Sequence, residues 1–327
     1  MNDLFMYRLG QKRGGGNSGG GGSGGGDEWI GDGNTHIWIS LAEGRTSPML
    51  GVGVNGTVTV DWGDGSEPDT LTGTSISTVK YTPVHEYAKP GDYVITLSGG
   101  SVGILGDFTY NRTCLLIHAN GVSDSASTAY TYSVRRVELG NNVKSIGKYA
   151  LRSCGTLTSV YIPDSVTSIG DKAFQDCYFL VSIHISDSVK IVGSNAFNNC
   201  YTLTSVHIPD NVTSIESSAF NNCYTLASVR IPNSVTSISD YTFAACRRFV
   251  SMYIPDSVTS IGGNAFRYCH SAAYYDFSRH TAIPTLAETN AFSNIPSDCE
   301  IRVPASLVDE WKAATNWSTY ADKIVGV

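Results

Sequence analysis

Six cysteines are the residues whose type and spacing first suggest chemistry, because each follows the last after 23 positions. Thiolates bind zinc and pair into disulfides, so a regular set of six raises both possibilities. Equivalent side chains in stacked units would instead point in parallel, about 4.8 Å apart, whereas a tetrahedral zinc site and a disulfide both need converging groups. We therefore expect a buried column of inert free thiols. The column comprises Cys154, Cys177, Cys200, Cys223, Cys246 and Cys269, and Cys114 and Cys299 fall outside it.

Two histidines, His184 and His207, occupy equivalent positions of neighbouring units and should stack, which can begin a metal site. The same position holds Tyr161 before them and Arg230 after them. A cation beside the pair repels a metal ion, and no carboxylate is adjacent. The sequence also carries no H-E-x-x-H motif and no P-loop. We therefore predict no metal site, no cofactor, no catalytic residues and no enzymatic activity.

One outward position in each unit changes its residue type almost every time, although the inward positions barely change. It lies between the last two inward residues of a predicted strand, on the expected concave side. Tyrosine and arginine are favoured interface anchors, and solenoids usually bind partners on a strand-lined face. We interpret this concave stripe as ligand-binding, and unconstrained solvated positions are the alternative. The stripe is Glu138, Tyr161, His184, His207, Arg230, Tyr253 and Asp276.

A second variable stripe flanks the cysteines and is rich in Tyr, Asn, Ser and Arg, a mixture typical of adaptable binding surfaces. Its tyrosines could hold sugar rings, or its Asn and Tyr side chains could stack on one another only to stabilise the array. Both interpretations stay open. The candidate ligand-binding residues are Tyr178, Tyr201, Tyr224, Arg247, Arg248 and Tyr268.

The framework for these columns is the regular array at residues 134–283, whose fixed period indicates a stacked solenoid. In one unit, Leu203, Val206 and Ile208 follow the inward pattern of a leucine-rich-repeat strand, and Pro209 ends ladder pairing because it lacks an N–H. Each coil is expected to run strand, turn, strand, turn and helical turn. The other inward residues of that unit are Val212, Ile215, Ala219, Phe220 and Cys223.

The repeat resembles the BspA-like leucine-rich repeat in its segments IPDSVTSIGDKAFQDC (162–177), IPDNVTSIESSAFNNC (208–223) and IPDSVTSIGGNAFRYC (254–269). That resemblance implies a bacterial cell-surface adhesin, a similar protist surface protein, or a phage or prophage protein. It also implies binding to host matrix proteins or other cells.

Residues 34–98 are expected to form a small immunoglobulin-like β-sandwich, because HIWISL and TVTVDW alternate apolar and polar residues. The order DWGDGS, HEY and PGDYVITL resembles the polycystic kidney disease (PKD) domain, which implies a spacer or a carbohydrate-associated accessory. Asp61 and Asp64 suggest calcium, but the EF-hand pattern is not met and turn formation explains them more simply.

The remaining segments are assigned by composition. Residues 1–13 form an apolar peptide that suggests docking to a larger assembly, and 14–33 form a glycine-rich flexible linker. Residues 99–133 are expected to be a degenerate first coil or N-terminal cap. Residues 284–327 should form a C-terminal cap with a helix, in which Ser306 and Asp309 resemble a capping box and Leu307, Trp311 and Ala314 form one apolar face.

The composition bounds the function. The net charge of −7 argues against nucleic acid as a partner, and no apolar stretch is long enough to span a bilayer. The N-terminus lacks a classical signal peptide. Either the protein leaves the cell by another route, or a signal is not needed, as in a virion protein released by lysis, or the sequence is trimmed. We expect an extracellular or virion-surface location.

The fold class predicted is mainly β: a leucine-rich-repeat solenoid with a C-terminal helical cap, preceded by the small sandwich. The function predicted is non-enzymatic recognition of a host or bacterial surface protein or glycan, as in a phage tail or virion attachment protein. The alternatives are a structural component of a larger assembly, anchored by residues 1–13, and a bacterial cell-surface adhesin.

Overall fold

The computed structural model describes residues 30–42, 47–107, 112–113, 116–118 and 133–327. The chain divides into two units, Met1–Ile30 and Gly31–Val327, and all the elements given below belong to the second. The apolar peptide 1–13, most of the linker 14–33, and Cys114 lie outside the described residues. Their assigned roles therefore stay predictions.

An antiparallel β domain opens the second unit. Strand β2 pairs with β3 and β4, and β4 pairs with β1. Alternation sets the buried face, since Ile37 and Ile39 of β1 and Ile95 and Leu97 of β4 are at most 1% exposed. Its strands are β1 (Thr35–Leu41), β2 (Pro48–Asp61), β3 (Asp69–Tyr81), β4 (Gly91–Ile104), β5 (Gly106–Asp107), β6 (Arg112–Thr113) and β7 (Leu116–His118).

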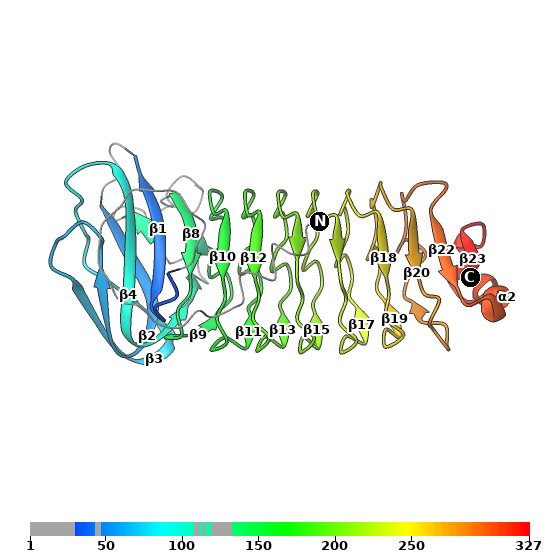
Figure 1. The fold of residues 1–327 in the computed structure, drawn as a ribbon, viewed down its shortest axis with the longest axis horizontal. Helices are drawn as coiled ribbons and strands as arrows, with labels where there is room; N and C mark the ends of the chain where they lie inside the picture. The colour runs from blue at the N-terminus through cyan, green and yellow to red at the C-terminus, as the bar shows by residue number, and fades with distance from the viewer. Residues whose placement is uncertain (1–29, 43–46, 108–111, 114–115, 119–132) are drawn as a thin grey trace. The chain divides into compact units, whose positions relative to one another are not determined.

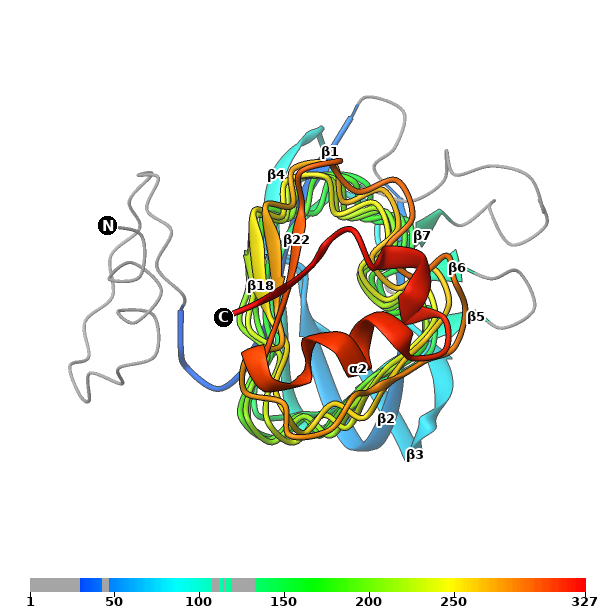
Figure 2. The ribbon, with the colours of Figure 1, turned by 90° about the vertical axis from the view of Figure 1, so that its right-hand side faces the viewer.

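The coils that follow contribute two series of short parallel strands, stacked in a nearly straight row (Figure 1). The predicted solenoid is therefore confirmed, and the coils superpose when viewed along the stack (Figure 2), so the strand-lined side is nearly straight rather than concave. The first series is β8 (Ser133–Glu138), β10 (Ser159–Tyr161), β12 (Ser182–His184), β14 (Ser205–Val206), β16 (Ser228–Val229), β18 (Ser251–Tyr253), β20 (Tyr274–Asp276) and β22 (Glu300–Val303). The second is β9 (Val143–Ile146), β11 (Ser168–Ile169), β13 (Ile191–Val192), β15 (Ser214–Ile215), β17 (Ser237–Ile238), β19 (Ser260–Ile261) and β21 (Thr285–Leu286).

A phenylalanine column fills the centre of the stack from Phe174 to Phe292, because each coil after the first buries one ring at the same register, where the first coil has Leu151. Phe197 and Phe220 stack with centroids 5.2 Å apart, and Phe220 and Phe243 with centroids 5.7 Å apart. These rings are completely buried. A single coil could not bury such a ring, so each coil is stable only when it is stacked on its neighbours.

The N-terminal end of the stack is closed by the preceding β domain. Strand β8 pairs antiparallel with β1, and β9 pairs parallel with β4, so the β1–β4 ladder joins both solenoid sheets. Strand β4 runs past the predicted domain end at Ser98. The assignment of 99–133 as a cap stays a prediction, because much of that segment lies outside the described residues.

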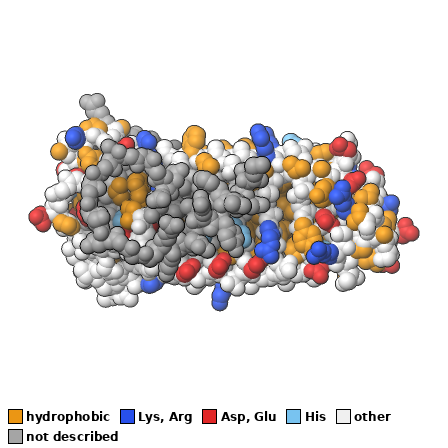
Figure 3. Space-filling view, in the orientation of Figure 1, with side chains coloured by type: hydrophobic (Ala, Val, Ile, Leu, Met, Phe, Trp, Pro, Cys, Tyr) orange, Lys and Arg blue, Asp and Glu red, His pale blue; other side chains and the backbone are white. Residues whose placement is uncertain are grey.

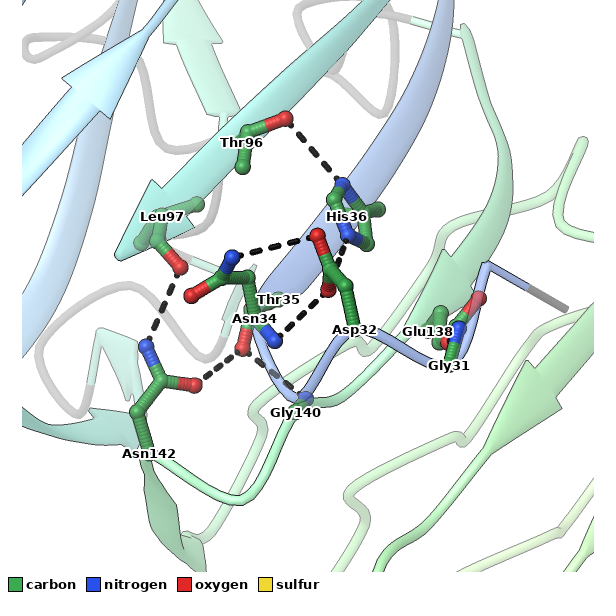
Figure 4. Close-up of polar contacts among 10 residues, drawn as sticks. All are labelled: Gly31, Asp32, Asn34, Thr35, His36, Thr96, Leu97, Glu138, Gly140 and Asn142. Atoms are coloured by element: carbon green, nitrogen blue, oxygen red, sulfur yellow. Dashed lines mark hydrogen bonds and ion pairs between the residues drawn. The ribbon is translucent and has the colours of Figure 1, made fainter. Parts of the chain in front are cut away.

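A polar network fastens this junction (Figure 4). The buried Thr35 hydroxyl donates to Asn142 Oδ1 at 2.8 Å and accepts from the Gly140 N–H, while Asn142 Nδ2 donates to the Leu97 carbonyl. The ring of His36 lies 2.9 Å from a carboxylate oxygen of Asp32. Because Thr35 and His36 are buried, their hydrogen bonds remove a desolvation penalty and fix the register of β1 on the first coil.

The C-terminal cap consists of η4 (Ala305–Leu307), α2 (Val308–Ala313), η5 (Trp317–Tyr320) and β23 (Ile324–Gly326), which pairs with β22. Figure 2 shows α2 lying across the end of the coils. Trp311 is fully buried there, and Leu307 and Ala314 pack against the core, as expected of one apolar face.

The predicted capping box is wrong. Ser306 lies inside η4, and the N-cap of α2 is Leu307, which has no side-chain cap bond. The helix also ends early, because Ala314 is extended and Asn316 is left-handed. Asn316 Nδ2 donates to the carbonyl of Leu286 at 2.7 Å, which ties this break to the last coil.

Candidate binding face

The first series of strands places the predicted concave stripe in register on what we call the first-strand face, the outward side of β8 to β22. Tyr161 lies opposite Glu138 on one side and His184 on the other, and Tyr253 lies opposite Asp276. These five stripe members therefore lie next to their partners in adjacent coils. The register adds one residue that sequence reasoning missed, since Arg302 of β22 lies next to Asp276.

Exposure varies along the stripe. Tyr161 and His184 are half-buried and stack with centroids 4.8 Å apart and planes 8° apart. His207 and Arg230 are exposed, and Tyr253 is 37% exposed. Glu138 departs from the expectation: only 3% of it is exposed, and its carboxylate accepts the N–H of Gly31 at 2.7 Å. The first rung of the stripe thus belongs to the fold rather than to an exposed surface.

The half-buried pair is neutral near pH 7. Burial lowers the pKa of His184, an effect that His207 reinforces and that the carboxylates of Asp164 and Asp187 oppose. Burial raises the pKa of Tyr161, helped by the charge of Asp164. A neutral imidazole on a neutral phenol offers a flat surface with little charge.

Charged groups gather toward the C-terminal coils. Arg230 pairs with Asp210 at 2.5 Å, and both side chains are more than half exposed. The guanidinium of Arg302 lies 3.7 Å from the ring centroid of Tyr274 and bonds Glu300 at 2.8 Å. Figure 3 shows basic, acidic and apolar side chains interspersed at this end of the molecule.

The second stripe contains a stack that we call the tyrosine ladder. The rings of Tyr178 and Tyr201 lie 5.1 Å apart, and those of Tyr201 and Tyr224 lie 4.8 Å apart. The guanidinium carbon of Arg247 lies 4.3 Å from the Tyr224 centroid and closes one end. Arg248 is exposed beside it. The three rings and one guanidinium form a single continuous surface.

Tyr268 belongs to a different column of the second stripe, immediately before a cysteine. That column has positive φ in every coil, as in Asp176 (63°), Asn199 (64°) and Asn222 (61°). Asn199 donates to Asp176 at 2.7 Å, and Asn222 donates to Asn199 at 2.9 Å. Asn and Asp tolerate the left-handed region better than most residues. The side chains in this column therefore stabilise the turns and link one coil to the next. Tyr268, which is 38% exposed, is the aromatic exception.

The cysteine column lies in the core, as predicted. All six thiols are free and buried, and each from Cys177 onward donates to a carbonyl of the preceding coil, as Cys223 does to Phe197 at 3.3 Å. Burial raises the pKa of Cys269 to about 12. Cys299, outside the column, is also buried and free. Within the described residues, no group of three or more His, Cys, Asp or Glu side chains is placed to hold a metal ion.

Asp61 and Asp64 accept turn hydrogen bonds in the β domain. Asp61 accepts the N–H of Gly63 at 2.8 Å, and Asp64 accepts the N–H of Ser66 at 3.1 Å. Asp64 also lies 2.9 Å from Nε2 of His85, whose ring stacks on Trp62. These contacts are those expected of turn-forming residues.

Comparison with known proteins agrees with this architecture. The family model described as "BspA type Leucine rich repeat region" matches residues 124–247 and 190–309, with six copies. No curated protein matches the chain. No helix within the described residues has the length and apolar character that a membrane span requires.

Several solved leucine-rich-repeat structures are similar. One from T. pallidum is 24% identical, covers 52% of this chain and 79% of its own, and has a TM-score of 0.37. One from Eubacterium ventriosum is 17% identical, with coverages of 76% and 66% and a TM-score of 0.42. A leucine rich cell surface protein from Faecalibacterium prausnitzii is 21% identical, with coverages of 74% and 88% and a TM-score of 0.26. These structural likenesses are weak and assign no function. The family model, in contrast, spans more than half of the sequence, and the chain belongs to the BspA type leucine-rich repeat family.

Proposed function

We propose that this chain is a non-enzymatic recognition protein that binds a protein or glycan on a host or bacterial surface. One observation carries the proposal. Of the eight large apolar side chains that are exposed within residues 139–283, five lie between the cysteine and the end of the first-series strand of their coil: Tyr178, Phe179, Val181, Val250 and Tyr253. That segment is under a third of each coil, so apolar exposure is concentrated on one side, as expected of an interaction surface.

The first-strand face and the tyrosine ladder together supply the contacts. Tyrosine and arginine anchors dominate binding energy in interfaces because they combine apolar area with a polar end. Parallel strands hold the anchors at fixed spacing, so little conformational entropy is lost when a partner binds. The β domain, whose sequence resembles the PKD domain, serves as the spacer that carries this face.

The setting of the protein is extracellular. Attachment of a virion through a phage tail and display on a bacterial surface use the same face, and we favour the virion because of the apolar peptide at residues 1–13.

The test is binding of the labelled full-length chain to whole bacterial cells and to immobilised matrix proteins and glycans. The stripe variant changes Tyr161, His184, His207, Arg230 and Tyr253 to Ala. The matched control changes one exposed residue before the second-series strand of the same coils: Thr167, Lys190, Thr213, Thr236 and Thr259 to Ala.

We expect binding that is lost in the stripe variant and kept in the control. Equal loss in both folded variants would contradict the assigned face. Absence of binding by the wild type would favour the structural role, which removal of residues 1–26 would then examine through loss of assembly.

A further inference from the structure

The two ends of the tyrosine ladder differ. At one end Arg247 covers the outer face of Tyr224, whereas at the other end the coil before Tyr178 carries Gly155 at the equivalent position. A Cβ built on Gly155 would lie 3.5 Å from Cδ2 of Tyr178, an ordinary contact distance. Among the residues that the structure describes, the outer face of Tyr178 therefore meets a glycine, where each face of the other two ladder rings meets a side chain.

Exposure agrees with this open position. Tyr178 is 39% exposed, whereas Tyr201 and Tyr224, which have a neighbour on both faces, are half-buried. Phe179 beside it is 59% exposed and Val181 is 45% exposed. Three exposed apolar side chains thus lie within four residues of one coil, next in the stack to the Gly155 position, which we call the vacant rung; this is a large apolar exposure for one coil.

The carboxylate of Asp176, two residues before Tyr178, is already engaged. Asp176 accepts the amide of Asn199 at 2.7 Å, and its second oxygen lies 3.7 Å from Nε of Arg152. A sugar needs several hydrogen-bond partners around its ring, whereas the exposed residues that follow Tyr178 in its coil, Phe179 and Val181, are apolar. The ladder itself also shows what fits, because two of its spacings are ring on ring at 4.8–5.1 Å.

We propose that the vacant rung is a subsite for an aromatic side chain of a protein partner, which stacks on Tyr178 above Gly155 and contacts Phe179 and Val181. This deepens the proposed function and rests on it in one respect, that the partner is a protein. The bound ring would continue the ladder by one coil. It would act as an anchor, because it enters a fixed position bordered by apolar groups.

The experiment compares two substitutions at Gly155 in the full-length chain. Gly155→Tyr supplies the missing ring and fills the rung, whereas Gly155→Ala adds only the Cβ that the structure accommodates. The φ angle of Gly155 is not positive, so its backbone can carry either side chain without the strain of the left-handed region. The probe is N-acetyl-L-tryptophanamide, followed by saturation-transfer NMR, with N-acetyl-L-leucinamide and methyl β-glucopyranoside as comparison ligands.

We expect the tryptophan probe to bind the wild type and Gly155→Ala within twofold of each other. We expect at least tenfold weaker binding to Gly155→Tyr, and weaker binding of both comparison ligands to the wild type. Tyr178→Ala, which removes the ring without adding bulk, should also lose the probe and covers the case in which Gly155→Tyr does not fold.

Equal probe binding by all variants, no binding by the wild type, or preferential binding of the glucopyranoside would overturn the subsite. The stripe variant described above leaves these residues unchanged. If the probe does not bind but the chain still binds cells, the subsite proposal is wrong and the proposed function stands. If the probe binds but the chain does not bind cells, the proposed function is wrong and the subsite proposal stands.

Discussion

Phe220 offers the sharpest test of the packing, because it is completely buried and stacks on a phenylalanine in each adjacent coil, at 5.2 and 5.7 Å. Phe220→Ala removes a ring that no neighbour can replace, and large-to-small changes of this kind cost about 3–5 kcal/mol. The two ring contacts, worth about 0.5–1.5 kcal/mol each beyond buried area, are part of that loss. We expect a decrease of about 3–5 kcal/mol in the free energy of unfolding.

The matched control is Phe179→Ala, since Phe179 is 59% exposed and should change stability by only about 0.5 kcal/mol. Guanidinium denaturation followed by circular dichroism measures both variants. Hydrogen exchange localises the effect, because coils of a repeat protein can open separately. A cost below about 1 kcal/mol for Phe220→Ala, or equal costs for the two variants, would refute the assignment of Phe220 to the shared core.

Three further predictions concern other parts of the fold. The six thiols of the cysteine column should resist a thiol reagent until the protein unfolds, since they are buried and burial raises the pKa of Cys269 to about 12. Fast labelling of these thiols in the native protein, located by mass spectrometry, would contradict this. Asn199→Ala should lower the free energy of unfolding by about 1–2 kcal/mol, because it places Ala at positive φ and removes two side-chain amide hydrogen bonds, and Asn199→Gly should cost less. Burial acts to raise the pKa of Asp64, but hydrogen bonds from Ser66 and His85 outweigh it and lower that pKa. Stability from Asp64 should therefore be present above its unfolded pKa of about 3.9 and be lost as pH falls, and Asp64→Asn should weaken this dependence in acid melts; an unchanged acid profile would oppose it.

The repeat made the solenoid predictable, because a 23-residue period repeats the same inward residues at the same register. Phe220, the cysteine column and the outward position of the first-series strands all follow from that period. The C-terminal apolar face was readable from Leu307, Trp311 and Ala314, but the break at Asn316 was not. That break depends on a bond to Leu286 in a coil far away in the sequence.

Long-range pairing explains most of what the sequence did not reveal. Nothing local indicates that β1 and β4 close the first coil, or that Gly31 reaches Glu138 and removes it from the exposed stripe. The 23-residue period did not predict Arg302 as a stripe member, because the coil before it is longer than 23 residues. The pairing of β20 with β22 shows that Arg302 lies next to Asp276. The vacant rung had a visible signal in Gly155, which precedes three tyrosines at the same position, but its meaning depends on rings that stack.

Oxidative footprinting of the wild-type chain, free and bound to the cells that it recognises, tests the central claim most directly. Tyr241 is an internal control for Tyr253, since the two side chains are similarly exposed, at 41% and 37%. Tyr253 lies on the first-strand face, whereas Tyr241 lies in the turn after β17. Binding through the first-strand face predicts that Tyr253 becomes protected while Tyr241 stays reactive. Protection of Tyr241 with an unchanged Tyr253 would contradict it.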